Sequence, residues 1–433
     1  MSQGIYISVP FCRSKCSFCN FASGVFSRAL FDGYVEQLCQ EISASYEIAG
    51  RLGGVLESTV DSVYLGGGTP SILTPDHLKR VFAAVRHVYE LSHSAEVTVE
   101  CAPGTLTDET VDALLQCGVN RVSLGVQSFV DKECSSVGRL HTRATTLDDI
   151  ARLRAAGIGN ISIDLIAGLP HQTAESWEVS LHETLATGVP HVSVYMLEVD
   201  DDSRLGTELL AGGSRYHAHF VPDDDLTADL YVAACERLER GRVHQYEISN
   251  FARPVTPGIG LWQSRHNLKY WTRQPYFSFG VDAHSMLPAA SGVQGDAVRF
   301  ATPDSLEAYS GRQPLSVLGS QLPDDPALNS EIVARIAQMR ESRTFVDRQA
   351  ALEESFFLGL RLNRGLSLPK LRARFGDTLM DGYTPILAEL IADGLLQQIA
   401  DRVKLTPRGR LLSNEVFARF LREEHPPQSI RRT

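Results

Sequence analysis

Three cysteines within eight residues form the part of this chain best suited to chemistry. Cys12, Cys16 and Cys19 follow the spacing C-x3-C-x2-C. With eight cysteines in 433 residues, chance would produce this spacing only about 0.003 times. Zinc is the simplest alternative, but a structural zinc site takes four ligands and no second Cys/His pair lies nearby. Three thiolates on one loop suit a 4Fe–4S cluster that leaves one iron without a protein ligand, and we favour that interpretation over zinc.

A glycine run is the second feature that could form part of a ligand-binding site. Gly66, Gly67 and Gly68 precede Thr69 and Pro70 at the end of an expected strand. Glycines allow the backbone to pass close to a ligand and to present its polar groups. Glycine runs after strands also form ordinary turns, so the motif is weak alone. It gains weight because it is expected at the same sheet edge as the cysteine loop.

Polar side chains recur at other expected strand ends, where core residues would be usual. They are Glu100, Gln127 and Asp164, and Arg139 follows as a cation that could pair with a carboxylate. A lone Asp in an apolar strand is more often a paired structural carboxylate. Several polar groups at one edge instead favour a site for a polar ligand.

Short β-rich runs alternate with amphipathic helical patterns from residue 5 to about residue 240. Strands are expected at Ile5–Val9, Ser62–Leu65, Glu96–Glu100, Arg121–Gly125, Ser162–Ile166 and His191–Leu197. Helices are expected at Phe31–Ile48, His77–Tyr89, Glu109–Cys117, Leu147–Ala156, Ala174–Thr187 and Leu226–Arg240. This alternation predicts βα units and a parallel sheet, either an open six-stranded barrel or a doubly wound sheet. Both folds place their chemistry at the carboxyl ends of the strands.

The chain divides into four parts on these patterns. Residues 1–240 are expected to form the site-bearing domain, and residues 241–302, which mix aromatics and glycine without a clear period, to complete it. A Pro-rich and polar linker is expected over 303–350. Residues 351–433 show three helical patterns, two short β-like runs and a final helix, which predict a winged-helix-like α+β module. Within the first part, residues 211–225 are rich in Gly, His and Asp and are expected to be a solvated loop.

Composition limits the function classes. Hydrophobic residues make up 43% and charged residues 21% of the chain, so a folded core is expected. The net charge of −11 disfavours nucleic-acid binding, and the last 83 residues carry only 13 basic against 10 acidic side chains. No apolar run is long enough for an integral membrane segment, and the start lacks a secretion signal. We therefore expect a cytoplasmic protein without nucleic-acid partners.

The motifs taken together resemble a known superfamily. Cys12-x3-Cys16-x2-Cys19 is followed in order by GGGTP, VTVEC, SLGVQSF, GRLH and IDLIAGLP. This series closely resembles the radical S-adenosylmethionine (SAM) superfamily, in the branch that holds oxygen-independent coproporphyrinogen III oxidase and the HemW-type haem chaperones. The resemblance covers residues 5 to about 290 with specific motifs and the C-terminal module more loosely. It implies a partial (β/α)6 radical-SAM barrel.

The resemblance also implies roles for individual residues. Cys12, Cys16 and Cys19 match the ligands of the 4Fe–4S cluster. The positions that match SAM contacts are Tyr6, Gly67, Gly68, Thr69, Glu100, Gln127, Arg139 and Asp164. Within that set the glycine loop would meet the methionine amino group, Arg139 the carboxylate, and Gln127 and Asp164 the ribose hydroxyls. Met196 is a weaker candidate for contact with the adenine. No residue is expected to be catalytic in its own right.

Two departures separate the chaperone pattern from the oxidase pattern. The oxidase has a fourth cysteine two residues beyond the third, where this chain has Phe21. It also carries a long N-terminal segment, whereas 11 residues precede Cys12 here. The run His266-Asn267-Leu268-Lys269-Tyr270-Trp271 resembles the HNxxYW motif of the HemW-type group. The expectation is a chaperone that binds haem as cargo and transfers it to acceptor proteins, without coproporphyrinogen oxidase activity. The oxidase remains the alternative, and a DNA-binding regulator acting through the tail is a distant third.

A histidine in the HNxxYW motif could ligate haem iron. Imidazole is a common axial ligand of haem, and this makes His266 a candidate haem-binding residue. A histidine in an aromatic and glycine-rich region is, however, often simply packed and hydrogen-bonded. His284 is a weaker candidate of the same kind.

Overall fold

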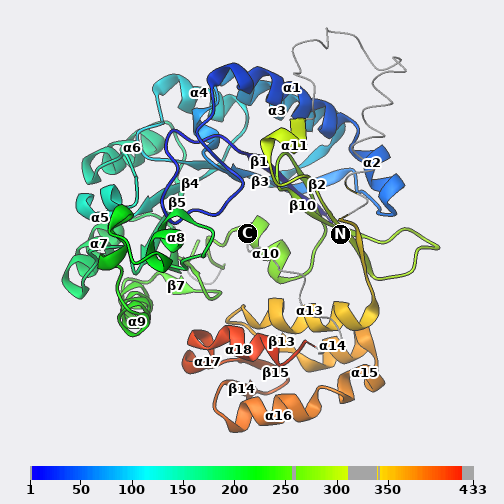
Figure 1. Cartoon of the computed structure of the whole chain (residues 1–433). Coiled ribbons are helices and arrows are strands. Elements are labelled where there is room, and N and C mark those ends of the chain that lie inside the picture. The colour runs from blue at the N-terminus through cyan, green and yellow to red at the C-terminus, as the bar shows by residue number, and fades with distance from the viewer. Residues whose placement is uncertain (1, 256–259, 311–338, 340–341, 422–433) are drawn as a thin grey trace.

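The computed structural model of the chain describes residues 2–255, 260–310, 339 and 342–421. An arc of helices surrounds the strands of the larger part, and a smaller, mainly helical module lies beside it at the C-terminal end of the described chain (Figure 1). The sequence patterns account for most of these elements.

The central sheet is built on six parallel strands. They are β1 (Gln3–Val9), β2 (Thr59–Gly67), β3 (Glu90–Cys101), β4 (Arg121–Gln127), β5 (Asn160–Ala167) and β6 (His191–Met196). Each strand pairs in parallel with the next along the chain. All six expected strands are present. Among the described strands, β1 to β6 lie side by side in chain order, without the reversal of strand order that a doubly wound sheet has, and the sheet does not close on itself. This arrangement confirms the partial (β/α)6 barrel.

Helices connect the parallel strands and cover their outer face. They are α1 (Phe31–Ser43), α2 (Ser45–Leu52), α3 (Pro75–Val88), α4 (Asp108–Gln116), α5 (Asp131–Ser136), α6 (Arg143–Ala155), α7 (Ala174–Thr187), α8 (Arg204–Leu210) and α9 (Asp224–Arg240). Threonines such as Thr107 and Thr173 cap helix starts by accepting the backbone N–H three residues on. The expected helix at Phe31–Ile48 divides at Ala44, where the backbone leaves the helical region. The short α5 and α8 were not expected, because six or seven residues show no clear period.

The segment at 211–225 is more ordered than the sequence suggested. It contains a 3-10 element, η3 (Arg215–Phe220), and the first residues of α9. The Asp223 side chain caps α9 by accepting a hydrogen bond from the backbone N–H of Leu226 at 2.8 Å. The Gly- and Asp-rich composition had favoured a loop, but an aspartate at such a position starts a helix as readily as it starts a turn.

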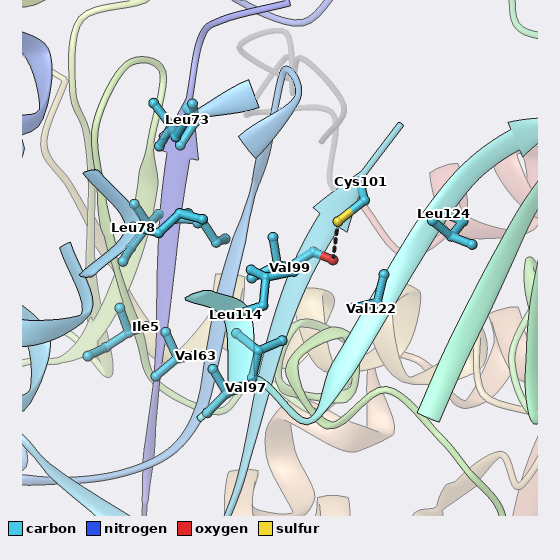
Figure 2. Packing of buried hydrophobic residues seen from close by; sticks show 14 of the residues in the cluster. Ile5, Val63, Leu73, Leu78, Val97, Val99, Cys101, Leu114, Val122 and Leu124 are labelled. Carbon is cyan, nitrogen blue, oxygen red and sulfur yellow. Dashed lines mark hydrogen bonds between the residues drawn. The ribbon is translucent and has the colours of Figure 1, made fainter. Parts of the chain in front are cut away.

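The main hydrophobic core lies between the strands and the helices. Alternate side chains of neighbouring strands point outward and pack against α3 and α4 (Figure 2). The residues labelled there are fully or almost fully buried and include Ile5, Val63, Val97, Val122, Leu78 and Leu114. The intervening side chains of the same strands face the barrel interior. Because a strand alternates its faces with a period of two, the apolar outer set leaves a polar inner set, including Ser62, Thr98 and Ser162.

Residues after α9 extend the sheet beyond the six predicted strands. The added elements are β7 (His244–Gln245), β8 (Asn250–Ala252), α10 (Arg265–Trp271), β9 (Tyr276–Phe279), β10 (His284–Pro288), β11 (Ala297–Ala301), α11 (Leu306–Ser310) and β12 (Thr344–Val346). Strand β9 pairs in parallel with β1, so it widens the barrel wall. The region expected as a linker, 303–350, contributes α11 and β12, and β12 pairs with β11. Its residues 311–338 and 340–341 lie outside the described residues.

The C-terminal module has its own sheet and core. Its elements are α13 (Arg348–Leu360), β13 (Leu366–Ser367), α14 (Leu368–Phe375), α15 (Asp377–Asp381), α16 (Thr384–Ala392), β14 (Leu396–Ile399), β15 (Arg402–Leu405), α17 (Pro407–Leu411) and α18 (Ser413–Ala418). The strand order is β13-β15-β14, and the Phe356 and Phe420 rings stack 4.6 Å apart at the centre. Helices packed on a small antiparallel sheet agree with the expected winged-helix-like module. Among the helices that the structure describes, none is long and apolar enough to cross a membrane.

Candidate functional site

The cysteine loop leaves the carboxyl end of β1 and folds back on itself. The backbone N–H of Cys12 donates to the carbonyl of Gly24 at 2.8 Å, which closes the loop at its base. Inside the loop the Lys15 ammonium donates to the carbonyl oxygens of Phe21 at 2.6 Å and Ser23 at 2.9 Å. These bonds hold the three partly exposed cysteine thiols on one short segment.

The electrostatics of the thiols link this loop to a neighbouring one. Burial raises the pKa of both Cys12 and Cys16. The Arg139 guanidinium is the strongest influence that lowers the pKa of Cys16, which places a permanent cation near the loop. Within the described part of the chain, no three His, Cys, Asp or Glu side chains are arranged to hold a single metal ion.

The glycine loop at the end of β2 touches the cysteine loop. The backbone N–H of Gly68 donates to the carbonyl of Val9 at 2.7 Å, and that of Thr69 donates to the carbonyl of Phe11 at 2.8 Å. A Cβ added at Gly68 would lie 2.7 Å from the Phe11 oxygen and 3.0 Å from the Cys12 sulfur. No side chain fits there, so glycine at this position is required by close approach of the backbones. Gly67 has a φ of +103°, a conformation that only glycine adopts without strain.

Two partly buried carboxyl groups lie near the end of β3 and in the middle of β5. Glu100 accepts a hydrogen bond from the Tyr64 hydroxyl at 2.8 Å and from the Gly67 backbone N–H at 3.1 Å. Burial raises the pKa of Glu100 to about 7, and the nearby Asp164 carboxylate adds to the effect. Asp164 accepts from the Ser123 hydroxyl at 3.0 Å, and burial raises its pKa too.

Gln127 and Arg139 carry buried polar atoms without partners. Among the described residues, the Gln127 Oε1 and the Arg139 Nε have no hydrogen bond. Both side chains converge over Gly125: a Cβ added there would lie 2.6 Å from Arg139 Nη2 and 3.3 Å from Gln127 Nε2. Gln127 also has a φ of +63°, next to a register shift between β4 and β5. A partly buried cation and a buried amide acceptor, each with an atom that has no protein partner, are what a zwitterionic ligand would satisfy.

Three other residues that the sequence singled out have different surroundings. Tyr6 faces the barrel interior and stacks on Tyr64, with ring centres 6.0 Å apart, and burial raises the pKa of its hydroxyl. Met196 ends β6 and packs at the border of the main core. His284, on β10, is exposed and lies 3.3 Å from the Asp282 carboxylate.

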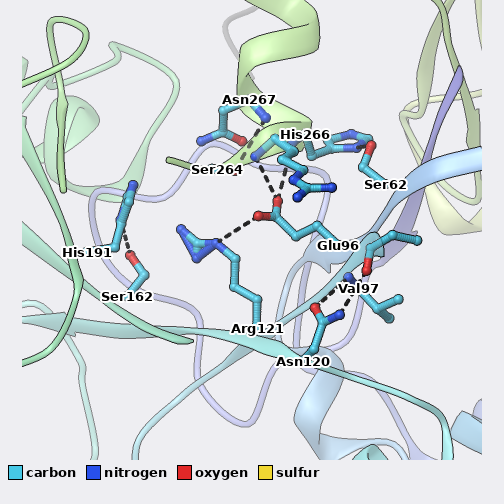
Figure 3. A network of polar contacts seen from close by, with 12 residues as sticks. Ser62, Glu96, Val97, Asn120, Arg121, Ser162, His191, Ser264, His266 and Asn267 are labelled. Atoms are coloured by element: carbon cyan, nitrogen blue, oxygen red, sulfur yellow. Dashed lines mark hydrogen bonds and ion pairs between the residues drawn. The ribbon is translucent and has the colours of Figure 1, made fainter. Parts of the chain in front are cut away.

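His266 lies inside the barrel, among the groups that close its amino end (Figure 3). It is 1% exposed. Its Nδ1 is 3.1 Å from the Ser62 hydroxyl and its Nε2 is 2.9 Å from the Tyr270 hydroxyl. Burial lowers the pKa of His266 to about 3, so the ring is neutral. Both ring nitrogens are therefore engaged within the protein.

The same network fixes the helix that carries the HNxxYW motif. The Glu96 carboxylate on β3 accepts from the backbone N–H of Arg265 at 2.8 Å and of His266 at 3.4 Å, at the start of α10 (Figure 3). On its outer side α10 meets the C-terminal module, where the Arg361 guanidinium lies 4.2 Å from the Trp271 ring. The motif therefore joins the barrel to the module.

Comparison with known proteins now identifies the family. Residues 6–183 match the Radical SAM superfamily, and residues 346–412 match the HemN C-terminal domain. "Heme chaperone HemW" of Lactococcus lactis subsp. lactis (strain IL1403) is 31% identical over 419 residues, which is 97% of each chain. The protein of the same name from Bacillus subtilis (strain 168) is 30% identical over 97% of this chain and 100% of the relative. The chain belongs to the HemW family of radical SAM proteins.

A solved structure supports the fold of this HemW-family chain. Coproporphyrinogen III oxidase (HemN) from Escherichia coli, described as a radical SAM enzyme, matches with a TM-score of 0.75. The match covers 97% of this chain and 90% of that chain at 21% identity. Such a likeness establishes the radical SAM fold and the presence of the C-terminal module, and at this identity it says nothing about activity.

Some residues of the HemW-family site were missed from the sequence. Tyr64 donates a hydrogen bond to Glu100, Ser123 donates one to Asp164, and Lys15 organises the cysteine loop. Tyr64 could have been found from the period-two pattern of β2, because it falls on the same face as Ser62 and Gly66. Lys15 gave no such signal, since a lysine between two cysteines is usually solvated.

Proposed function

We propose that this HemW-family chain is a haem chaperone that carries a 4Fe–4S cluster and binds SAM. The observation that supports it best is the convergence of three thiols with the unpartnered Arg139 and Gln127 at one edge of the sheet. The near full-length likeness to proteins named heme chaperones supports the haem-carrying role.

The donor sets fit these groups. Three thiols offer three ligands for a cubane cluster, which leaves one iron free to chelate a small molecule. SAM has a carboxylate, an ammonium group and a ribose diol. The partly buried Arg139 guanidinium supplies a cation for the first, and the Glu100 carboxylate beside the glycine loop supplies an acceptor for the second. When bound, the cluster and SAM together supply one-electron chemistry.

The chain's own residues have separable tasks in this proposal. Gly67, Gly68 and Thr69 bring the glycine loop against the cysteine loop, and Tyr6 and Tyr64 fill the interior beneath it. Asp164, held by serine hydroxyls, is an acceptor for the ribose diol, together with Gln127.

Haem is proposed as cargo, and its acceptor is proposed to be another protein. Of the two porphyrin-related roles, the oxidase has no feature of this chain in its favour beyond the fold. Phe21 stands where the oxidase pattern has its fourth cysteine, and its side chain is 47% exposed. Ligation of haem iron by His266 stays a prediction, and it requires the release of both ring nitrogens from buried bonds.

Haem transfer tests the proposal. The anaerobically reconstituted full chain is loaded with haem, separated from free haem, and mixed with apomyoglobin as a probe acceptor. The proposal predicts transfer that is faster from the loaded chain than from haem on serum albumin. Failure of the chain to retain haem through the separation would reject a chaperone role. The Cys16→Ala variant in parallel shows whether transfer depends on the cluster.

A further inference from the structure

Two histidines from different loops meet at the carboxyl edge of the barrel. His171 lies in the loop after β5, and His217 lies in η3, in the connection between β6 and α9. The His171 Nε2 and the His217 Nδ1 are 3.1 Å apart, which is hydrogen-bond distance. The pair includes part of the Gly-, His- and Asp-rich segment, which has no role in the function proposed above.

The two loops are fixed to each other. The backbone N–H of His171 donates to the carbonyl of Phe220 at 3.0 Å, and the two rings lie 3.9 Å apart. His171 has a φ of +68°, a conformation uncommon outside glycine. Its neighbour Gln172 holds that turn, because its side-chain amide donates to the carbonyl of Ile166 at 3.1 Å and its oxygen accepts from the Leu169 N–H at 3.3 Å.

The hydrogen bond constrains which nitrogen carries a proton. A neutral imidazole has one donor and one acceptor nitrogen. Because the two facing nitrogens share one hydrogen bond, one of them donates and the other accepts. With His171 Nε2 as acceptor, His217 donates through Nδ1 and its Nε2 lone pair is free. No described residue bonds that Nε2, and the His217 side chain is exposed.

This arrangement is typical of a histidine that ligates a metal. Such histidines almost always donate their second ring nitrogen to a neighbouring acceptor, which fixes the tautomer and strengthens the ligand. His266 differs, since both of its nitrogens are engaged and its side chain is buried.

Exposed apolar side chains and a cation lie on α8 and η3, the helix next to His217 and the element that carries it. Three large apolar side chains are exposed on α8 and η3, with 39% exposure at Leu209, 71% at Leu210 and 46% at Phe220. The Arg215 guanidinium lies over the Tyr216 ring on the same element, 5.0 Å from its centre. The apolar ring of a porphyrin would pack on such side chains, and one of its two carboxylates would pair with the Arg215 guanidinium.

This surface adjoins the proposed cofactor site. Helix α8 contacts η3, and the backbone N–H of Leu205 in α8 donates to the carbonyl of Ser17 in the cysteine loop at 2.9 Å. A ligand on α8 and η3 would therefore lie next to the loop that carries the cysteines.

We propose that His217 ligates the iron of haem through Nε2, with His171 as the positioning residue that holds its tautomer. This inference rests on the proposed haem-carrying function and assigns its ligand. The apolar side chains of α8 and η3 would cover one part of the porphyrin, and Arg215 would face a propionate.

Paired titrations with haem and with iron-free protoporphyrin IX test the assignment. The full chain and its His217→Ala variant are titrated anaerobically in the presence of a chelator, so that free metal ions do not compete. Loss of the iron–imidazole bond should weaken haem binding of His217→Ala by about tenfold or more and remove the absorption bands of a nitrogen-ligated haem. Protoporphyrin IX binding should be the same for both proteins. His182→Ala, at an exposed histidine on α7, is the matched control and should resemble wild type.

His171 is tested by rescue. His171→Ala should weaken haem binding and broaden the ligand bands, whereas His171→Gln, whose amide oxygen can accept the Nδ1 proton, should restore both. An unchanged haem spectrum in His217→Ala would overturn the assignment, and so would an equal loss of haem and protoporphyrin IX binding. If the wild-type chain binds no haem, the proposed function itself fails, which is a different result.

Discussion

Arg139 offers a test in which ligand binding and stability should move in different directions. Its Nε is buried without a partner among the described residues, and its guanidinium lies across Gly125. In the chain without SAM, a buried unsatisfied donor costs about 1–3 kcal/mol. The change Arg139→Ala should therefore leave the free energy of unfolding of the SAM-free chain equal to or above that of wild type.

Binding of SAM should respond in the opposite way. If Arg139 pairs with the carboxylate, its loss should cost about 2–3 kcal/mol of binding, which is about 30- to 150-fold in Kd. Calorimetric titration of reconstituted protein measures the affinity, and urea denaturation measures the stability. Arg143→Ala is the control, because Arg143 is exposed and bonds Glu183 at 2.8 Å. The reasoning is refuted if Arg139→Ala binds SAM like wild type, or if the variant is less stable by more than about 1 kcal/mol.

Three further predictions concern the cluster, the glycine loop and Glu100. Replacing any one of Cys12, Cys16 or Cys19 with Ala should abolish the binding of roughly four irons per chain, whereas Cys39→Ala should not. Iron and sulfide analysis measures the cluster content, and a full cluster content in Cys16→Ala would contradict the prediction. Gly68→Ala should lower the free energy of unfolding by about 1–3 kcal/mol and reduce the iron content, because the added Cβ would meet the backbone oxygens of Val9 and Phe11. Gly50→Ala is the control and should change neither quantity, because the space around Gly50 is open. The pKa of Glu100 is raised to about 7, so the native state holds the proton more tightly than the unfolded chain. The protonated Glu100 contributes fully to the free energy of unfolding below about pH 4.5. That contribution falls by about 3 kcal/mol as the pH rises to 7. Relative to Glu100→Gln, wild type should lose that much between pH 4.5 and 8 in urea denaturation, and parallel pH profiles would contradict the assignment.

The six parallel strands could be predicted because their signal is local. In β5, Ile161, Ile163 and Leu165 alternate with polar residues, and such a pattern identifies a strand with one apolar face. Strand β9 could not be predicted in the same way. It has four residues, and its place depends on pairing with β1, about 270 positions earlier in the chain. Local sequence contains no information on such a partner.

The candidate site shows the same division. The spacing of Cys12, Cys16 and Cys19 and the series of motifs identify the edge of the sheet, because short-range spacing is visible in a sequence. The surroundings of His266 are not visible, since they depend on Ser62, which is 204 positions away. The same holds for the unpartnered Arg139, whose isolation follows from the packing of several loops. Residue type thus predicted which side chains could bind a ligand, and only the fold determined which of them have free polar atoms.

Porphyrin handling by one reconstituted sample distinguishes a haem chaperone from a coproporphyrinogen oxidase. Full-length protein with its cluster and SAM is divided, and one half is titrated with haem while the other is incubated anaerobically with coproporphyrinogen III and a reductant. A haem chaperone should show saturable haem binding and no conversion to protoporphyrinogen IX above the control without protein. Turnover of coproporphyrinogen III, or absence of saturable haem binding, would contradict it.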